Sequence, residues 1–263
     1  MTIAVPALDV HFGHSHLKRP DTTGRFVVVI DVLRASTTIT TALHHGARAV
    51  WAVAEPSDAR RVARTVGRAT SVLGGERNAE RIAGFDLGNS PREYRASIVA
   101  GKSVVTTTTN GTRAILAGRR GASRLVVGSF VNFSVVLREL TAALRAGTSV
   151  AVICAGSEGQ FSLEDAVCAG RFVRRAVVSV ANSRAHSARF TPRLNDAARV
   201  ARLLERPYMR NLSLLFTDAS HARTLRRAGF ARDLAACAEL DAHPVVPVLV
   251  GRRLVLTRRD GGF

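Results

Sequence analysis

The sequence contains few cysteines and no long apolar run. Its three cysteines, Cys154, Cys168 and Cys237, are an odd number and form no Cys-x-x-Cys pair, which argues against a disulfide framework and against a zinc site. No apolar stretch reaches about 18 residues, so no transmembrane helix is expected. The N-terminal stretch also lacks the charged segment and apolar core of a secretory signal. We therefore expect a cytoplasmic protein with reduced thiols.

Lysine and aromatic residues are scarce as well. Lys18 and Lys102 are the two lysines, and aromatic residues make up 5% of the chain, so the formal net charge of +18 comes almost entirely from arginine. The arginines are scattered and are not interleaved with aromatic side chains, as a surface that stacks bases would require. Nucleic-acid binding is therefore not favoured, whereas a positive field would attract a small anionic substrate.

The chain of 263 residues, 46% of them hydrophobic, shows a repeated alternation of strands and helices. Apolar runs predict strands at 27–30, 49–53, 72–73, 102–106, 124–127 and 150–154. Caps and amphipathic segments predict helices that begin near residues 36, 57, 90, 112, 132, 162, 196, 220 and 230. This order predicts an α/β fold with a mostly parallel sheet and a closing antiparallel hairpin over 245–250 and 253–257. No linker divides residues 1–263 into separable domains.

The N-terminal histidines and the segment that begins at Ser90 are interpreted as structural and not as functional features. His11, His14 and His16 match no standard zinc spacing, so we expect them in a solvated, partly frayed N-terminal turn. Ser90 opens a capping box with proline at the first helical position, which predicts a helix over 90–101 that Ser90 caps.

The loop after the first of these strands carries the densest set of functional groups. Asp31 follows the buried strand 27–30, and Arg34 and Ser36 come just before or at the start of the next helix. Ligands of open α/β sheets bind at such strand ends, and the free N–H groups of a helix N-terminus favour anions. We therefore predict that Asp31 is catalytic and that Arg34 and Ser36 bind an anionic substrate.

Other strand ends add acidic and anion-binding candidates. The acidic candidates are Glu76, Asp86, Glu164 and Asp165, although the last two also fit the first turn of a capped helix. The further substrate-binding candidates are Arg77, Thr108, Asn110, Gly111, Thr112, Arg113 and Gly156. Carboxylates on converging loops suit a hard cation such as Mg²⁺, and arginine forks suit phosphate oxygens. This inventory fits a metal-dependent phosphatase with a small phosphorylated substrate.

Nucleophilic alternatives are weaker. Cys154 has Gln160 six residues on, where a cysteine phosphatase loop needs arginine, so a buried strand-end thiol is the favoured interpretation. No serine stands in the Gly-x-Ser-x-Gly setting of a nucleophile elbow. Asp31 remains open as a phosphoryl acceptor, but Leu33 stands where haloacid-dehalogenase phosphatases carry a second aspartate.

Several long strings resemble the 2-phosphosulfolactate phosphatase family. They are VIDVLRASTTI from Val29, LGGERNAERIAGFDLGNSPREY from Leu73, TTTNGTRAI from Thr107, GSFVN from Gly128 and CAGSEGQFSLEDAVCAG from Cys154. The stretch LRRAGFARDLAACAELD from Leu225 is similar to the family's C-terminal part. The resemblance extends over about residues 27–255.

The resemblance implies a magnesium-dependent hydrolase that releases phosphate from 2-phospho-3-sulfolactate, a step toward coenzyme M. It implies a three-layer α/β/α fold of two similar, intertwined lobes. It also favours Asp31, Glu76, Asp86, Glu164 and Asp165 as the acidic site. For their roles we hypothesise that Asp31, Glu76 and Asp86 are catalytic groups and that all five are Mg²⁺ ligands, with a metal-activated water attacking phosphorus. Three alternatives stay open: an anion-binding or regulatory protein of the same fold without turnover, a nucleic-acid binder, and a phosphatase for a phospho-acid without sulfonate. A homo-oligomer stays open for each of them.

Overall fold

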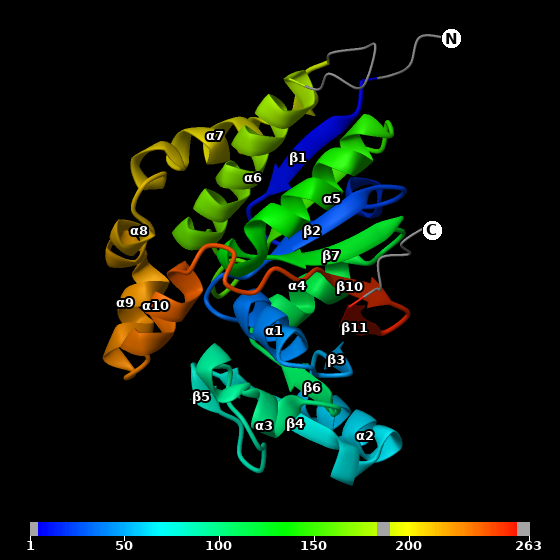
Figure 1. Cartoon of the computed structure of the whole chain (residues 1–263), viewed down its shortest axis with the longest axis vertical. Coiled ribbons are helices and arrows are strands. Elements are labelled where there is room, and N and C mark those ends of the chain that lie inside the picture. The colour runs from blue at the N-terminus through cyan, green and yellow to red at the C-terminus, as the bar shows by residue number, and fades with distance from the viewer. Residues whose placement is uncertain (1–4, 183–189, 257–263) are drawn as a thin grey trace.

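A mixed sheet of eleven strands runs through the molecule (Figure 1). The computed structural model describes residues 5–182 and 190–256. The strands lie side by side in the order β5-β4-β6-β3-β11-β10-β7-β2-β8-β1-β9. Their bounds are β1 Ala7–His11, β2 Phe26–Ile30, β3 Ala49–Ala52, β4 Ser71–Arg77, β5 Glu80–Arg81, β6 Ser103–Thr107, β7 Arg124–Gly128, β8 Val150–Cys154, β9 Arg193–Leu194, β10 Pro247–Val250 and β11 Arg253–Leu256.

Ten α-helices in the described ranges cover the sheet. They are α1 Ala35–His44, α2 Pro56–Val66, α3 Ala96–Val99, α4 Gly111–Gly118, α5 Phe133–Arg145, α6 Leu163–Ala181, α7 Asp196–Leu204, α8 Leu212–Asp218, α9 Ser220–Arg227 and α10 Ala231–Ala238. Within these ranges, every helix is too short or too polar to span a bilayer. The predicted α/β fold is confirmed.

Two groups of parallel strands make up most of the sheet, and the hairpin joins them. One group contains β7, β2, β8, β1 and β9, and the other contains β3, β6 and β4. The predicted hairpin β10–β11 lies between the groups and is antiparallel to both neighbours, through Val248 opposite Val126 and Leu254 opposite Val50. The two groups therefore run in opposite directions. The chain crosses from the first group to the second after β2 and returns after β6.

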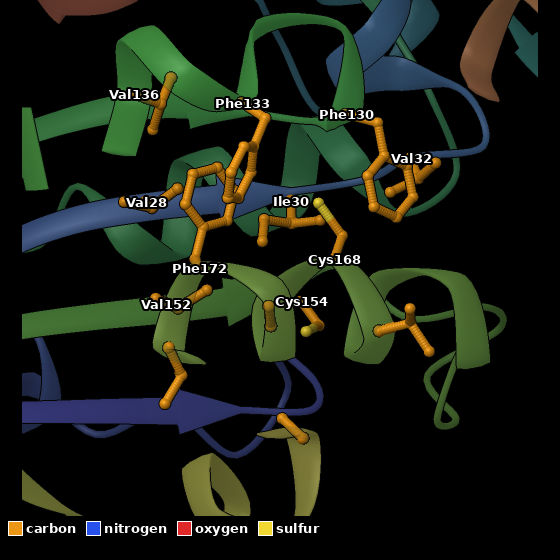
Figure 2. Close-up of a cluster of buried hydrophobic side chains, with 14 of the residues drawn as sticks. Val28, Ile30, Val32, Phe130, Phe133, Val136, Val152, Cys154, Cys168 and Phe172 are labelled. Atoms are coloured by element: carbon orange, nitrogen blue, oxygen red, sulfur yellow. The ribbon is translucent and has the colours of Figure 1, made fainter. Parts of the chain in front are cut away.

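Alternate residues of β2 pack on opposite faces of the sheet, as a strand buried on both sides requires. Val28 and Ile30 belong to the core that α5 and α6 cover, whereas Val27 and Val29 belong to the core that α1 and α4 cover. Figure 2 shows Val28 facing the rings of Phe133 and Phe172, whose centroids lie 4.6 Å apart. A smaller core under α2 contains Leu73 and Val105. Helices thus cover both faces of the sheet.

Two expectations from the sequence are wrong, and one helix was not predicted. His11 ends strand β1 instead of lying in a frayed turn, because β1 pairs with β8 over Leu8–His11 opposite Val150–Ile153. The segment 90–101 is a 3-10 turn (Pro91–Glu93) followed by the short α3, with no side-chain cap from Ser90. Helix α8 was not expected. The hairpin is confirmed up to Leu256, whereas Thr257 lies outside the described residues.

The packing of Phe172 generates a stability prediction. Phe172 is fully buried, so Phe172→Ala should leave a cavity and lower the free energy of unfolding by about 3–5 kcal/mol. Val178 lies on the same helix and is 49% exposed, so Val178→Ala should change that free energy by no more than about 0.5 kcal/mol. Denaturant unfolding of both variants checks the prediction, and equal losses would contradict this description of the core.

Candidate active site

Asp31 lies directly after β2 and is fixed by the first turn of α1. Its carboxylate accepts a hydrogen bond from the backbone N–H of Ala35 at 3.1 Å, and its own backbone N–H donates to the Ser36 hydroxyl at 2.8 Å. A Cβ at Gly111 would lie only 2.5 Å from Oδ2 of Asp31, so glycine leaves the room that this carboxylate occupies. The loop after the strand thus holds a buried carboxylate in one orientation.

Glu76 is the second carboxylate of the site and lies near the end of β4. Its Oε1 accepts from the backbone N–H of Thr109 at 2.9 Å, and its Oε2 accepts from the backbone N–H of Ala79 at 3.0 Å. The preceding Gly75 has a φ of 140°, and a Cβ there would collide with the carbonyl of Thr107. The loops after β4 and β6 therefore fix Glu76 together, and they require glycine beside it.

Asp31 and Glu76 line the same cleft, which has a volume of about 410 Å³. This size is typical of a pocket for a small molecule. The cleft also receives residues from the loops after β6 and β8 and from α9. The full lining is Asp31, Leu33, Arg34, Glu76, Asn78, Ala79, Asn89, Thr109, Asn110, Ser157, Glu158, Ser220, His221, Thr224 and Leu225.

Arg34 brings a buried positive charge to this cleft. Its side chain is only 2% exposed and forms an ion pair with Asp233 of α10 at 2.8 Å. Its second terminal nitrogen lies 3.3 Å from the carbonyl oxygen of Ala79, and the ring of Phe230 stacks 4.1 Å from the guanidinium carbon. Segments far apart in the sequence therefore hold Arg34 beside Asp31.

Two further predicted acids, Glu164 and Asp165, are buried beneath the cleft and do not line it. Asp165 accepts a hydrogen bond from the backbone N–H of Val32 at 2.8 Å with one oxygen and from that of Gly156 at 3.1 Å with the other. The predicted cap is confirmed, because the Ser162 hydroxyl accepts from the backbone N–H of Asp165. Asp165 therefore ties the loop after β2 to the loop after β8.

Burial and like charge make these acids hard to ionise. The pKa of Asp31 is raised to about 7, first by burial and then by Glu76 and Glu164, while the N–H of Ala35 and the Arg34 guanidinium lower it. Burial also raises the pKa of Glu164. Burial, Asp31 and Glu164 raise the pKa of Asp165 well above its usual range, against its two backbone hydrogen bonds. Such a cluster gains stability from a bound cation.

Three further charged residues that were predicted for the site, Asp86, Arg77 and Arg113, also lie outside the cleft lining. Asp86 pairs with Arg68 at 2.6 Å, its side chain is 37% exposed, and it accepts from the backbone of β4. Arg77 donates to the carbonyl of Ala54 and to the Thr107 hydroxyl. Arg113 pairs with Glu55 at 3.1 Å on the surface. Of the three predicted arginines, Arg34 is the one that lines the cleft.

The small residues predicted for the site mainly form hydrogen bonds that involve backbone groups of its loops. Ser36 holds the N–H of Asp31, and Gly156, at a φ of 74°, donates to Asp165. Thr112 donates to the carbonyl of Thr108 at 3.0 Å, and the Thr108 hydroxyl accepts from the backbone N–H of Thr112 at 3.1 Å. These residues shape the loops, whereas Asn110 at the start of α4 lines the cleft itself.

The cysteines do not line the cleft. Cys154, Cys168 and Cys237 are all buried and free. Burial is the main cause that raises the pKa of Cys154 well above its usual value, which disfavours a nucleophilic thiolate. Cys154 is therefore the buried strand-end thiol that the sequence predicts.

The sequence did not identify His221 or Asn89 as site residues. His221 begins α9, and its Nε2 lies 3.1 Å from the carbonyl oxygen of Leu33, so Nε2 carries the hydrogen and Nδ1 is the atom that can accept a proton. Asn89 is 5% exposed, and its buried Oδ1 has no hydrogen-bond partner among the described residues. The polar loop at 84–90 was a signal for Asn89. No local pattern marks His221.

The side chains of the cleft could supply only part of the coordination shell of a Mg²⁺ ion. In residues 5–182 and 190–256, no three His, Cys, Asp or Glu side chains are placed to hold a metal ion together. Asp31 and Glu76 nevertheless present two carboxylates to one cleft, and no described side chain or backbone donor is hydrogen-bonded to Oδ2 of Asp31. Mg²⁺ commonly binds one or two carboxylates and completes its shell with water and substrate oxygens.

The raised pKa of Asp31 predicts a pH-dependent cost to stability. Because this pKa is about 7 in the folded protein and 3.8 without burial, the folded state binds the proton more tightly, and stability falls as pH rises from about 4 to 7. Asp31→Asn removes that cost. In chelator, the variant should unfold with a free energy several kcal/mol higher than the unsubstituted protein at pH 8, and the difference should narrow toward pH 4.

Denaturant unfolding at a series of pH values measures this difference. Glu239→Gln is the control, because it neutralises an exposed carboxylate at the end of α10. A constant difference between Asp31→Asn and the unsubstituted protein at all pH values would show that Asp31 is not the titrating group.

Comparison with known proteins identifies the family of this chain. A model of the family described as 2-phosphosulpholactate phosphatase matches residues 13–252. A relative from Symbiobacterium thermophilum, named probable 2-phosphosulfolactate phosphatase, is 42% identical over 89% of this chain and 94% of its own length. Relatives with the same name from Caldanaerobacter subterraneus subsp. tengcongensis and Thermotoga petrophila are 34% and 37% identical, over 92% and 88% of this chain and 95% and 92% of their own lengths.

These matches cover Asp31, Glu76 and the loops that position them, and they extend over most of the chain. The family match also spans α8, α9 and α10, which include His221 of the cleft lining and Asp233, the ion-pair partner of Arg34. The chain belongs to the 2-phosphosulfolactate phosphatase family.

Proposed function

We propose that this protein is a magnesium-dependent phosphatase that hydrolyses the phosphate monoester of 2-phosphosulfolactate. The observation that carries the proposal is the meeting of Asp31, Glu76 and Arg34 in one cleft of about 410 Å³. The names of the relatives support the substrate. The strand-end position of the cleft supports a small-molecule site.

The charge of the cleft supports a cation as part of the reaction. The substrate carries phosphate, sulfonate and carboxylate, and the cleft lining places Asp31, Glu76 and Glu158 against the single guanidinium of Arg34. The carboxylates of the cleft would repel such an anion. A divalent cation between the carboxylates and the substrate would allow the substrate to bind. Asp31 and Glu76 would hold Mg²⁺, which supplies neutralisation of phosphate charge and a lowered pKa for bound water.

The chain's own groups bind and orient the substrate. Arg34 offers buried N–H donors to phosphate oxygens, which is where charge concentrates during phosphoryl transfer. Asn110 lies at the start of α4, whose backbone N–H groups favour an anion. Asn89 brings an amide with an unpaired oxygen to the same cleft. His221 can take up or release a proton at Nδ1.

Phosphate release by the purified protein tests the proposal. We expect turnover of 2-phosphosulfolactate with Mg²⁺ and a loss of at least about 100-fold with chelator, because two carboxylates cannot bind a polyanion unaided. Phospholactate, which lacks the sulfonate, is the comparison substrate. Turnover that chelator does not reduce would contradict the role of magnesium, and turnover of neither compound would contradict the proposed activity.

Substitution of the two cleft carboxylates tests their role. Asp31→Asn and Glu76→Gln should each lower kcat/KM by about 100-fold or more and raise the Mg²⁺ concentration needed for half-maximal rate. Asp86→Asn changes a carboxylate outside the cleft lining and should alter kcat/KM less than about threefold. Equal losses for Asp86→Asn and Asp31→Asn would place the metal elsewhere.

A further inference from the structure

We infer that Asp233 is a positioning residue of the reaction, which fixes the guanidinium of Arg34 toward the substrate. The inference rests on the proposed function and extends it to α10, a helix that follows Arg34 by about two hundred residues in the sequence. Helix α9 lines the cleft, and α8 and α10 both pack against α9 and against each other. In Figure 1 these helices lie together beside the loop that follows β2.

Both carboxylate oxygens of Asp233 accept a hydrogen bond. Oδ2 accepts from a terminal nitrogen of Arg34 at 2.8 Å, and Oδ1 accepts from the Ser90 hydroxyl at 2.7 Å. The Arg34 and Asp233 side chains are each only 2% exposed. A buried ion pair with further hydrogen bonds has one geometry, unlike an exposed pair, so the guanidinium cannot turn freely.

The other contacts of Arg34 leave only part of it free for a ligand. Phe230 covers one face of the guanidinium, and the carbonyl of Ala79 takes one N–H. A guanidinium carries five N–H donors, and the described residues accept two of them. An anion must therefore approach in the plane of the group. The orientation of that plane decides whether Arg34 reaches phosphate oxygens.

Asp233 acts from behind Arg34. Arg34 lines the main cleft, whereas Asp233 lines a separate hollow of about 410 Å³ on its other side, with Ser90, Arg92 and Phe230 among its neighbours. The ion pair thus lies between the two spaces. Because Asp233 is not in the lining of the cleft that contains Asp31, its effect on the substrate must pass through Arg34.

Kinetics of Asp233 variants test the inference. Asp233→Ala should raise the KM for 2-phosphosulfolactate and the inhibition constant of inorganic phosphate by about tenfold or more, because Arg34 loses its fixed orientation. Asp233→Asn keeps an oxygen that accepts from Arg34, and the Ser90 hydroxyl can turn to accept from the amide. This variant should stay within about threefold of the unsubstituted protein in both constants.

The double variant Arg34→Ala, Asp233→Ala separates positioning from a general loss of structure. If Asp233 acts through Arg34, its removal should add less than about threefold to the effect of Arg34→Ala on both constants. Full additivity, or an Asp233→Ala variant with unchanged constants, would overturn the inference.

Two matched variants control for folding. Glu205 is a second buried acid paired with arginines, Arg171 and Arg174, and it lies away from the cleft lining, so Glu205→Gln should lower stability without changing KM. If Asp233→Ala does not fold, Phe230→Leu removes the flat face beneath the guanidinium and should raise the phosphate inhibition constant by about threefold or more. An unchanged constant in Phe230→Leu would then overturn the inference.

The unsubstituted protein is measured in every experiment. Absence of phosphate release from it would count against the proposed function, and calorimetric binding of inorganic phosphate would then still compare the Asp233 variants. Unchanged phosphate binding in Asp233→Ala beside an active unsubstituted protein would count against Asp233 alone.

Discussion

Negative charge buried at strand ends is the constraint that organises this structure. Asp31, Glu76, Glu164 and Asp165 are all less than a tenth exposed, and neighbouring carboxylates add to burial in raising the pKa of Asp31 and of Asp165. Backbone N–H groups stabilise part of this negative charge by hydrogen bonds. Ala35 donates to Asp31, and Thr109 donates to Glu76. The loops after β2, β6 and β8 therefore have little freedom, because a backbone N–H of each one is hydrogen-bonded to a carboxylate from another segment.

The loops of the cleft come from two groups of strands that run in opposite directions. The loops after β2 and β8 come from one group and the loops after β4 and β6 from the other, yet all four line or support one cleft. Helix α9 contributes His221 to the cleft lining, and α10 contributes Asp233, which pairs with Arg34 from outside that lining. The site is thus assembled from three parts of the chain that no single βαβ unit contains.

The sequence predicted those parts of the fold and site that depend on local patterns. The strands from Phe26–Ile30 to Val150–Cys154 and the strand-end carboxylates Asp31 and Glu76 follow from apolar runs and the residues that end them. Contacts between residues far apart in the sequence could not be predicted. Strand β1 pairs with β8, Asp233 forms an ion pair with Arg34, and Asp86 forms one with Arg68 outside the cleft. The sequence offers three arginines that could bind a substrate. Only the tertiary structure shows that one of them, Arg113, forms an ion pair with Glu55 instead.

The central place of the hairpin bears on how the protein is made. Strands β10 and β11 follow every other described strand along the chain, yet they pair with β7 and β3 in the middle of the sheet. Until they leave the ribosome, β7 and β3 each present an open edge with unpaired N–H and C=O groups. The nascent chain therefore passes through a stage with two exposed sheet edges, a stage at which chaperones would bind it and at which association between copies is favoured.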